Sequence, residues 1–213
     1  MNAELLWTYL KRYCGFAFKN KSFIIGGIAV YLYLYPAQLL LAATRGVQEA
    51  GLYRVALMPC TAYYAIVVAA FSVYFPEIAK THGEKGAHND ALVRRLFILL
   101  TCMGIAGWIG MMGAKRVFLF LVGPSFVLSA GLAPALVVSK GIGGVGLLAR
   151  SVLLAKGKET FVYLLFMAMG IVSVVANLVV IPRYGLFGAA MTEVAAESIH
   201  LIIMLVALIE WKT

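Results

Sequence analysis

The sequence predicts an all-α integral membrane protein, a bundle of six transmembrane helices. Of its 213 residues, 63% are hydrophobic, and the mean hydropathy is +0.94. A soluble domain of this length does not need so much apolar surface. Apolar runs of about 20 residues, the length of a helix that crosses a bilayer, recur along the chain. Most basic residues stand between these runs, so the net charge of +9 favours membrane orientation over nucleic-acid binding.

Residues 1–22 are predicted to be a cytoplasmic or interfacial lead-in to the bundle. They mix aromatic and basic side chains without a long apolar run, a composition that suits a helix at the headgroup level. The six-helix lobe then occupies residues 23–213. Its first span is predicted over 23–44, with Pro36 inside it. A proline inside a helix removes a backbone hydrogen bond and produces a kink.

The second span is predicted over 53–75, with Pro59 inside it, and a polar segment follows over 76–95. The third span, over 96–113, has glycines in steps of three: Gly104, Gly107, Gly110 and Gly113. Small residues at that spacing allow another helix to approach closely.

Residues 114–126 are too short for a span, and we expect a re-entrant or interfacial piece that turns at Gly123-Pro124. The fourth span is predicted over 127–149, with Pro134 and Lys140 inside it. A basic loop is expected after it, with Arg150, Lys156 and Lys158.

The fifth and sixth spans are predicted over 161–181 and 186–209. The turn between them, Pro182-Arg183-Tyr184-Gly185, is so short that the two spans must form a helical hairpin. The run 141–146 spells GxGxxG, but it lies inside an apolar segment and not between a strand and a helix. It therefore predicts a flexible or closely packed helix break, not a dinucleotide site.

The distribution of Lys and Arg predicts the orientation, because positively charged loops stay on the cytoplasmic side. Twelve of these residues lie in the N-terminal segment, in the loops after the second and fourth spans and at the C-terminus. Five lie on the opposite side, and Lys140 lies within a span. Both termini are therefore predicted to be cytoplasmic.

Several motifs resemble those of one transporter family. The run NLVVIPRYGLFGAA, over 177–190, resembles the NxxxIPxYGxxGAA hairpin of Wzx-like polysaccharide flippases, a branch of the MATE/MOP exporter superfamily. Similar motifs follow in the family's order: a helix-opening GxYxxA over 50–56, a helix-closing proline at Pro76, an outer turn over 121–126 and a cytoplasmic loop over 154–158. Together they cover nearly the whole chain.

The resemblance is to the C-terminal half of the family, and it implies what the chain would do. Full members have twelve or fourteen helices in two lobes, and they move polyprenyl-diphosphate-linked oligosaccharides, such as O-antigen or exopolysaccharide units, across the bacterial cytoplasmic (inner) membrane. This chain would be one lobe. The resemblance therefore implies a missing N-terminal lobe, a split-gene partner or a second copy in a homodimer.

Three ionisable residues share one face of the sixth span. Glu193, Glu197 and His200 stand at i, i+4 and i+7, and charged groups inside a membrane are functional candidates. We expect the two carboxylates to line a cavity that binds a proton or cation or meets basic groups on the substrate path. The alternative is a buried ion pair or interhelical hydrogen bonding. His200 is expected to be a hydrogen-bonded interior histidine.

Lys140 stands halfway along the fourth span, where a cation costs about 3 kcal/mol on insertion scales. Two interpretations carry equal weight. The ammonium group would bind the diphosphate of the lipid-linked sugar, or it would form a salt bridge to Glu193 or Glu197. The two are compatible, because a salt bridge can open when a phosphate arrives.

Three further candidates remain. Arg45 and Arg54 flank an outer turn and are expected to be headgroup-level anchors, with Arg54 also a candidate for the substrate path. Asn177 is expected to form interhelical hydrogen bonds. No catalytic residue, cofactor or metal site is predicted, and the short outer loops disfavour a membrane enzyme of glycan assembly. A cation- or proton-coupled exporter of the same superfamily, and an inactive or structural fragment, stay open as alternatives.

Overall fold

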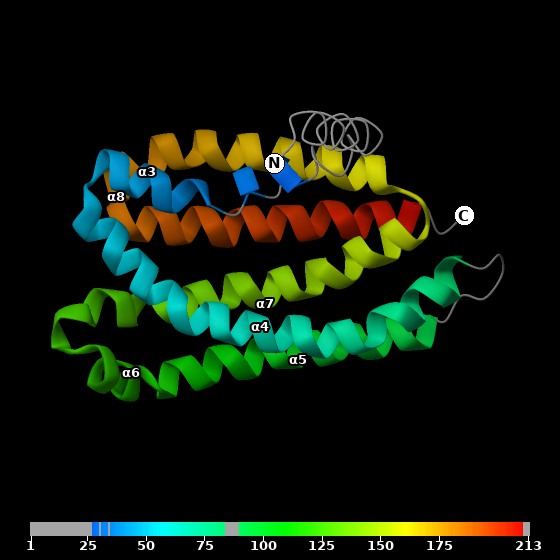
Figure 1. The fold of residues 1–213 in the computed structure, drawn as a ribbon, viewed down its shortest axis with the longest axis horizontal. Coiled ribbons are helices and arrows are strands. Elements are labelled where there is room, and N and C mark those ends of the chain that lie inside the picture. Colours follow the sequence, from blue (N-terminus) through cyan, green and yellow to red (C-terminus); the bar gives the residue numbers. More distant parts are fainter. Residues whose placement is uncertain (1–26, 30, 34, 84–89, 211–213) are drawn as a thin grey trace, which may run out of the picture.

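The structure is a computed structural model that describes residues 27–29, 31–33, 35–83 and 90–210 (Figure 1). These residues form helices and turns, and none of them is in a strand. The lead-in predicted over 1–22 lies outside the described residues.

The first predicted span is bent. Its described residues form two helical pieces, Gly27–Tyr33 and α3, Pro36–Thr44, which meet at 49°. Pro36 occupies the first turn of α3, where its missing N–H has no intrahelical partner to lose. The bend that we predicted at Pro36 is thus present, but the proline begins a helix and does not lie inside one.

The second span is longer than predicted. Helix α4, Val47–Gly83, contains both Pro59 and Pro76. The predicted helix end at Pro76 is therefore wrong, although the part of α4 that is apolar enough to cross a membrane ends close by, at Ile78. The carbonyl that a proline leaves without a partner inside a helix can be satisfied by small local adjustments, and the buried Ile78 holds the following turn in the bundle.

The third span also begins earlier than predicted, since α5 extends over Asp90–Gly113. A short helix, α6 (Lys115–Val122), and a 3₁₀ turn, η1 (Pro124–Phe126), follow it. Gly123 separates the two with a φ of +105°, a backbone conformation open to glycine. This confirms the prediction of a piece too short to span that turns at Gly123-Pro124.

Helix α7, Val127–Ala155, runs without interruption through 141–146. The predicted helix break is therefore wrong, whereas the close packing is present. A Cβ atom on Gly141 would lie 3.0 Å from the Cα atom of Gly104 in α5. Helix α7 also continues past Arg150, which is a helix residue and not the loop residue that we predicted.

Helix α8, Glu159–Glu210, folds back on itself at Gly185, where φ is +55° and ψ is −134°. Its two arms run antiparallel, the first in yellow and orange and the second in orange and red (Figure 1). The hydroxyl of Thr192 in the second arm donates a hydrogen bond of 2.6 Å to Asn177 Oδ1 in the first. The predicted hairpin is thus confirmed.

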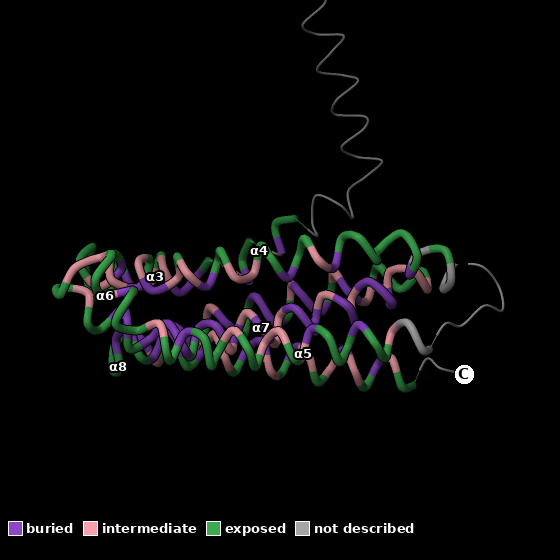
Figure 2. Tube along the Cα trace, turned by 90° about the horizontal axis from the view of Figure 1, so that it is seen from below, coloured by how far each residue is buried: buried purple, intermediate pink, exposed green. Residues whose placement is uncertain are grey.

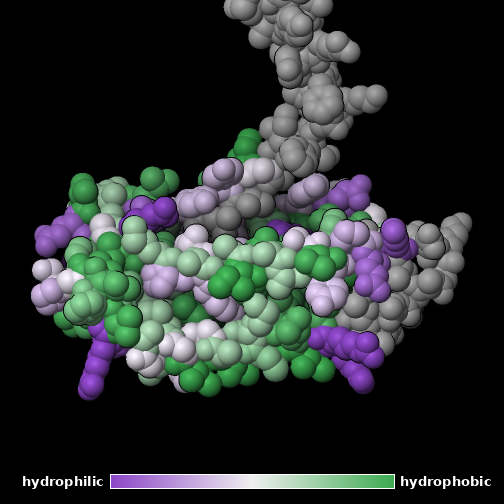
Figure 3. Space-filling model, turned by 60° about the horizontal axis from the view of Figure 1, so that its bottom comes forward, coloured by the Kyte–Doolittle hydropathy of each residue, from purple (hydrophilic) through white to green (hydrophobic). Residues whose placement is uncertain are grey.

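Helix α7 is the centre of the bundle. It packs against α4, α5 and α8, and α3 packs against α8 and α4. In the most apolar stretch of α7, 61% of the residues are buried, whereas in that of α5 only 17% are. Figure 2 shows this difference along the chain. Figure 3 shows one face with hydrophobic residues over its middle and strongly hydrophilic residues mainly towards its two ends.

Among the described residues, four helices are long and apolar enough to cross a membrane: Val47–Ile78, Val93–Gly113, Pro124–Ala155 and Glu159–Glu210. The bent pair at α3 qualifies as a further candidate. The described residues are therefore those of an all-α, multi-pass membrane protein.

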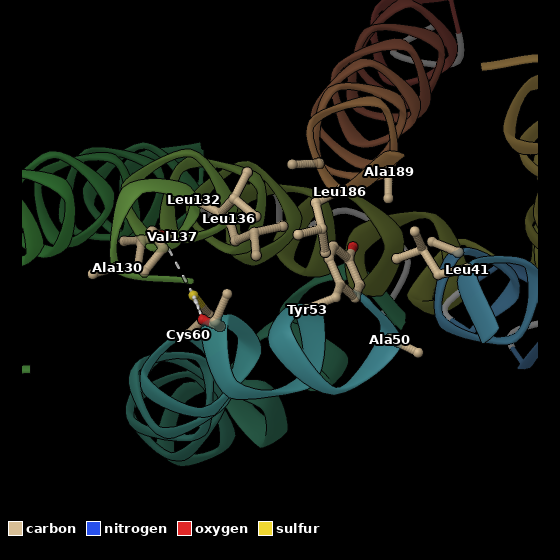
Figure 4. Close-up of a cluster of buried hydrophobic side chains, with 14 of the residues drawn as sticks. Leu41, Ala50, Tyr53, Cys60, Ala130, Leu132, Leu136, Val137, Leu186 and Ala189 are labelled. Carbon is tan, nitrogen blue, oxygen red and sulfur yellow. Dashed lines mark hydrogen bonds between the residues drawn. The ribbon is translucent and has the colours of Figure 1, made fainter. Parts of the chain in front are cut away.

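A buried apolar cluster joins α3, α4, α7 and α8 (Figure 4). Leu41, Tyr53, Leu136 and Leu186 contribute one side chain from each of these helices. The Cys60 thiol donates to the Ala56 carbonyl of its own helix at 3.2 Å and lies 3.5 Å from the Ala133 carbonyl of α7. This cluster places the Tyr53 ring against α8, beside the charged residues described next.

Candidate functional site

The interior of the bundle contains an ion pair between α7 and α8. Lys140 Nζ lies 2.6 Å from Glu193 Oε1, and each side chain is 16% exposed. Of the two salt bridges that the sequence left open, the structure contains the one to Glu193. A pair removed from water to this extent is stable only if hydrogen bonds satisfy its remaining atoms.

Two hydroxyl groups supply such hydrogen bonds to Glu193. Ser139 Oγ, one residue before Lys140, donates to Oε1 at 3.3 Å. The Tyr53 hydroxyl, from α4, donates to Oε2. The carboxylate thus accepts from an ammonium and two hydroxyl groups, and hydrogen bonds to a charged acceptor are stronger than neutral ones. The ion pair is therefore held by three helices.

Glu197, one turn further along α8, has a different environment. The residue is only 8% exposed, and its carboxylate packs on Gly143 of α7, where a Cβ atom would lie 3.3 Å from Oε2. Among the described residues, no Lys or Arg nitrogen lies within 4 Å of it. The seam between α7 and α8 therefore contains two carboxylates and one paired cation.

A small polar cavity of about 20 Å³ lies beside the ion pair. Its lining includes the following polar residues of the bent first span, α7 and both arms of α8: Tyr33, Lys140, Ser173, Asn177, Glu193 and Glu197. That volume holds one water-sized group. In this conformation the site can therefore bind a water molecule or exchange a proton, but it cannot hold a larger substrate group.

His200 is an interior residue, as predicted. It is 4% exposed and lies between two aromatic rings, with ring centroids 5.1 Å from Tyr33 and 4.6 Å from Phe166. Its Nε2 atom has no hydrogen-bond partner among the described residues. The predicted hydrogen bond is therefore absent at that nitrogen, and the ring is held by aromatic packing.

Asn177 joins the two arms of α8. Its Oδ1 accepts the hydrogen bond from Thr192, and its Nδ2 donates to the Ser173 carbonyl at 2.8 Å. The predicted interhelical hydrogen bond is confirmed.

The two arginines lie apart from the ion pair. Arg45 is exposed at the hairpin end, and its Nε donates to the Ile181 carbonyl at 3.4 Å. Arg54 is exposed on α4 and lines a wide, mainly apolar groove of about 1100 Å³ between α3 and α4. The structure thus brings together Lys140, Glu193 and Glu197 and leaves Arg54 on a separate surface.

Sequence reasoning did not single out Tyr53 and Ser139, although both bind Glu193. Tyr53 appeared only inside a family motif, and Ser139 is one of several hydroxyl residues within apolar runs. In the sequence, each of the two is marked only by a hydroxyl group within an apolar helix, and many residues without a functional role have the same feature. Their role follows from how α4 packs on α7 and α8, which spacing along one helix does not reveal.

Comparison with protein-family models, curated proteins and solved structures finds no match. The resemblance to polysaccharide flippases stays a prediction that rests on the motifs quoted above. In the part of the chain that the structure describes, no group of three or more His, Cys, Asp or Glu residues could hold a metal ion.

Proposed function

We propose that the chain is one lobe of a membrane carrier for a polyprenyl-diphosphate-linked oligosaccharide, a flippase for O-antigen or exopolysaccharide units. The observation that carries this proposal is the largely buried ion pair of Lys140 and Glu193. A cation halfway along an apolar helix costs about 3 kcal/mol to insert into the membrane. A lysine without a function at this position would therefore only destabilise the inserted protein. An ammonium group is also a compact point charge that suits a phosphate.

In the proposed mechanism, Glu193 holds the Lys140 charge while the lobe is closed. The diphosphate of the substrate then replaces the carboxylate as the partner of Lys140. The cavity of about 20 Å³ is too small for a diphosphate, so α3 must move away from the seam to admit it. The bend before Pro36 and the turn at Gly46, with a φ of +94°, lie at the two ends of α3 and would act as its hinges.

Arg54 would meet the same phosphates earlier on the path. It lies on the wide groove between α3 and α4, where the walls are apolar and the arginine supplies the charge. Among the described residues Arg54 has no carboxylate within 4 Å, so its charge is available to an anionic substrate.

The bundle would cross the membrane six times. The spans would be the bent pair at α3, then α4, α5, α7 and the two arms of α8. The ends of α4 and α7 and the start of α5 lie together at one end of the bundle (Figure 1). Arg94, Arg95, Lys156 and Lys158 lie at or next to these helix ends, which favours that end as the cytoplasmic one. In the bacterial inner membrane, both termini would then be cytoplasmic, and a second lobe or a second copy of this chain would complete the carrier.

A second candidate function is a cation- or proton-coupled exporter, and the observation that favours it is Glu197. Its carboxylate is buried without a cation within 4 Å among the described residues. A carboxylate in that state can take up a proton or a small cation, and its occupancy could drive transport of a different substrate.

Transport by reconstituted vesicles tests these functions against each other. Vesicles that contain the protein receive a fluorescent polyprenyl-diphosphate oligosaccharide, and a membrane-impermeant quencher reports its movement between leaflets. We expect protein-dependent movement that is about tenfold slower in the double variant K140M/E193Q, because the phosphate loses a charge-assisted hydrogen bond. The control K115M removes an exposed cation of α6 and should leave the rate unchanged.

Two outcomes would contradict the flippase proposal. One is an unchanged rate in K140M/E193Q. The other is cation-driven efflux of a drug substrate without movement of the lipid-linked oligosaccharide, which would favour the exporter.

A further inference from the structure

A second interior cation lies near the far end of α7. Arg150 stands five residues before the end of that helix at Ala155, about 7.5 Å along the helix axis. Among the described residues, no carboxylate oxygen lies within 4 Å of it. The ion pair of Lys140 and Glu193 therefore leaves this arginine without a direct counter-charge.

Arg150 lines a pocket of about 290 Å³ between α4, α7 and the first arm of α8. Apart from Arg150 and Ser151, its walls are aromatic or aliphatic, with Phe71 and Phe75 from α4 and Tyr163 from α8. The Arg150 guanidinium carbon lies 5.3 Å from the centroid of the Phe166 ring. Stacking of this kind holds the planar guanidinium in one orientation and leaves its edge free to donate hydrogen bonds.

The pocket therefore combines one oriented cation with walls that suit a hydrocarbon chain. It lies at the end of the bundle where Arg94 and Arg95 of α5 are also exposed. A cationic pocket between membrane helices, close to a membrane surface, is the kind of site that binds lipid head groups.

We propose that this pocket binds an anionic phospholipid of the adjacent leaflet. Its phosphate accepts hydrogen bonds from Arg150, and one acyl chain lies along Phe71 and Phe75. Phe75 is 43% exposed, so the chain reaches the pocket from the surrounding bilayer. A zwitterionic lipid binds less well because its own cation lies close to the arginine. Free phosphate lacks the chain that fills the apolar walls.

This site is independent of the proposed carrier function. It requires only that the bundle is embedded in a bilayer with anionic lipid, and the residues that line the pocket come from α4, α7 and the first arm of α8. A bound lipid would link α4 to the first arm of α8, and it would do so whatever substrate the protein transports.

Lipid titration followed by native mass spectrometry tests the site. The purified full chain in detergent micelles is titrated with phosphatidylglycerol or, separately, phosphatidylcholine, and the fraction of protein that retains one lipid is measured. We expect the wild type to prefer phosphatidylglycerol by about tenfold, the range of a charge-assisted hydrogen bond. R150Q should lose that preference. F75A should bind both lipids more weakly and keep the preference.

The control R183Q removes an exposed arginine in the hairpin turn, at the opposite end of the bundle, and should behave as the wild type. An unchanged preference in R150Q, or an equal loss in R183Q, would overturn the proposal. So would displacement of phosphatidylglycerol by inorganic phosphate at equal concentration, because Arg150 would then bind free anions. If R150Q does not fold, R150K, which keeps the charge, should keep the preference, and F75A decides the proposal: unchanged binding of both lipids in F75A would overturn it.

Discussion

At the scale of single residues, Lys140 pairs with Glu193 because further donors converge on that carboxylate. Ser139 and Tyr53 both donate to Glu193, whereas Glu197 packs against the backbone of Gly143. The sequence showed that Lys140 and the two carboxylates lie within apolar spans and that the carboxylates share a helix face. It did not distinguish between the two possible partners, because that choice depends on a tyrosine from a third helix.

The variant K140M should lower the free energy of unfolding by about 3–5 kcal/mol, because it leaves Glu193 as an unpaired buried charge. K140M/E193Q should recover most of this loss, since neither residue is then charged. Thermal unfolding in detergent measures both variants. Equal stability of K140M and the wild type would show that the pair is not buried in the native protein.

The variant N177A should destabilise the protein by about 0.6–1.7 kcal/mol, the range measured for hydrogen bonds between membrane helices. It removes the acceptor that links Thr192 to the first arm of α8 and leaves the hydroxyl with the Gly188 and Ala189 carbonyls of its own arm. T61V is the matched control, because Thr61 is exposed and, among the described residues, its hydroxyl bonds to the Leu57 carbonyl of its own helix alone. A loss as large in T61V as in N177A would contradict the interhelical role.

At the scale of helices, the apolar runs predicted the cores of the spans, and the short turn at Gly185 predicted the hairpin. The errors concern helix ends and irregularities. Pro76 and the glycines of 141–146 are poor helix formers in water, so they suggested a helix end and a break. In an apolar bundle, tertiary packing overrides these preferences, and both α4 and α7 continue through them.

Only two of the four regularly spaced glycines of α5 lie against another helix among the described residues. Gly104 lies against Gly141 of α7 and Gly107 lies under the Tyr63 ring, but a Cβ atom on Gly110 or Gly113 would meet nothing within 4 Å. The glycine spacing correctly predicted that another helix approaches α5 closely. How far along α5 the contact extends depends on the helices that pack against it, and the spacing does not show this.

The variant G141A should therefore destabilise the protein by about 1–3 kcal/mol, the usual cost of overpacking. Its new methyl group would lie 3.0 Å from the backbone of Gly104, which cannot move without shifting α5. G110A is the matched control in α5 and should be neutral or slightly stabilising, since alanine is the better helix former. Thermal unfolding that ranks the two variants in the opposite order would contradict this crossing.

At the scale of the whole molecule, the sequence predicted an all-α membrane bundle, and the described residues form one. The proposed number of spans and the proposed orientation rest on the hairpin of α8 and on the distribution of Lys and Arg. The proposed assembly with a second lobe or a second copy would depend on surfaces such as the groove at Arg54, which no pattern in a single chain identifies.

The proposed orientation places Lys158 on the cytoplasmic side and Arg183 on the opposite side. In a background without native cysteines, K158C should react with a membrane-impermeant maleimide only after the membrane is made permeable. R183C should react in intact cells. Reaction of both positions from the same side would contradict a single crossing between them and the six-span topology.

The central claim is that Lys140 exchanges Glu193 for the diphosphate of a substrate, and the affinity of two variants for a polyprenyl diphosphate tests it most directly. E193Q leaves the Lys140 charge without its carboxylate partner and should bind the diphosphate more tightly than the wild type. K140M/E193Q lacks the cation and should bind about tenfold more weakly than E193Q. Equal affinities of E193Q and K140M/E193Q would contradict the account, because the diphosphate would then not reach Lys140.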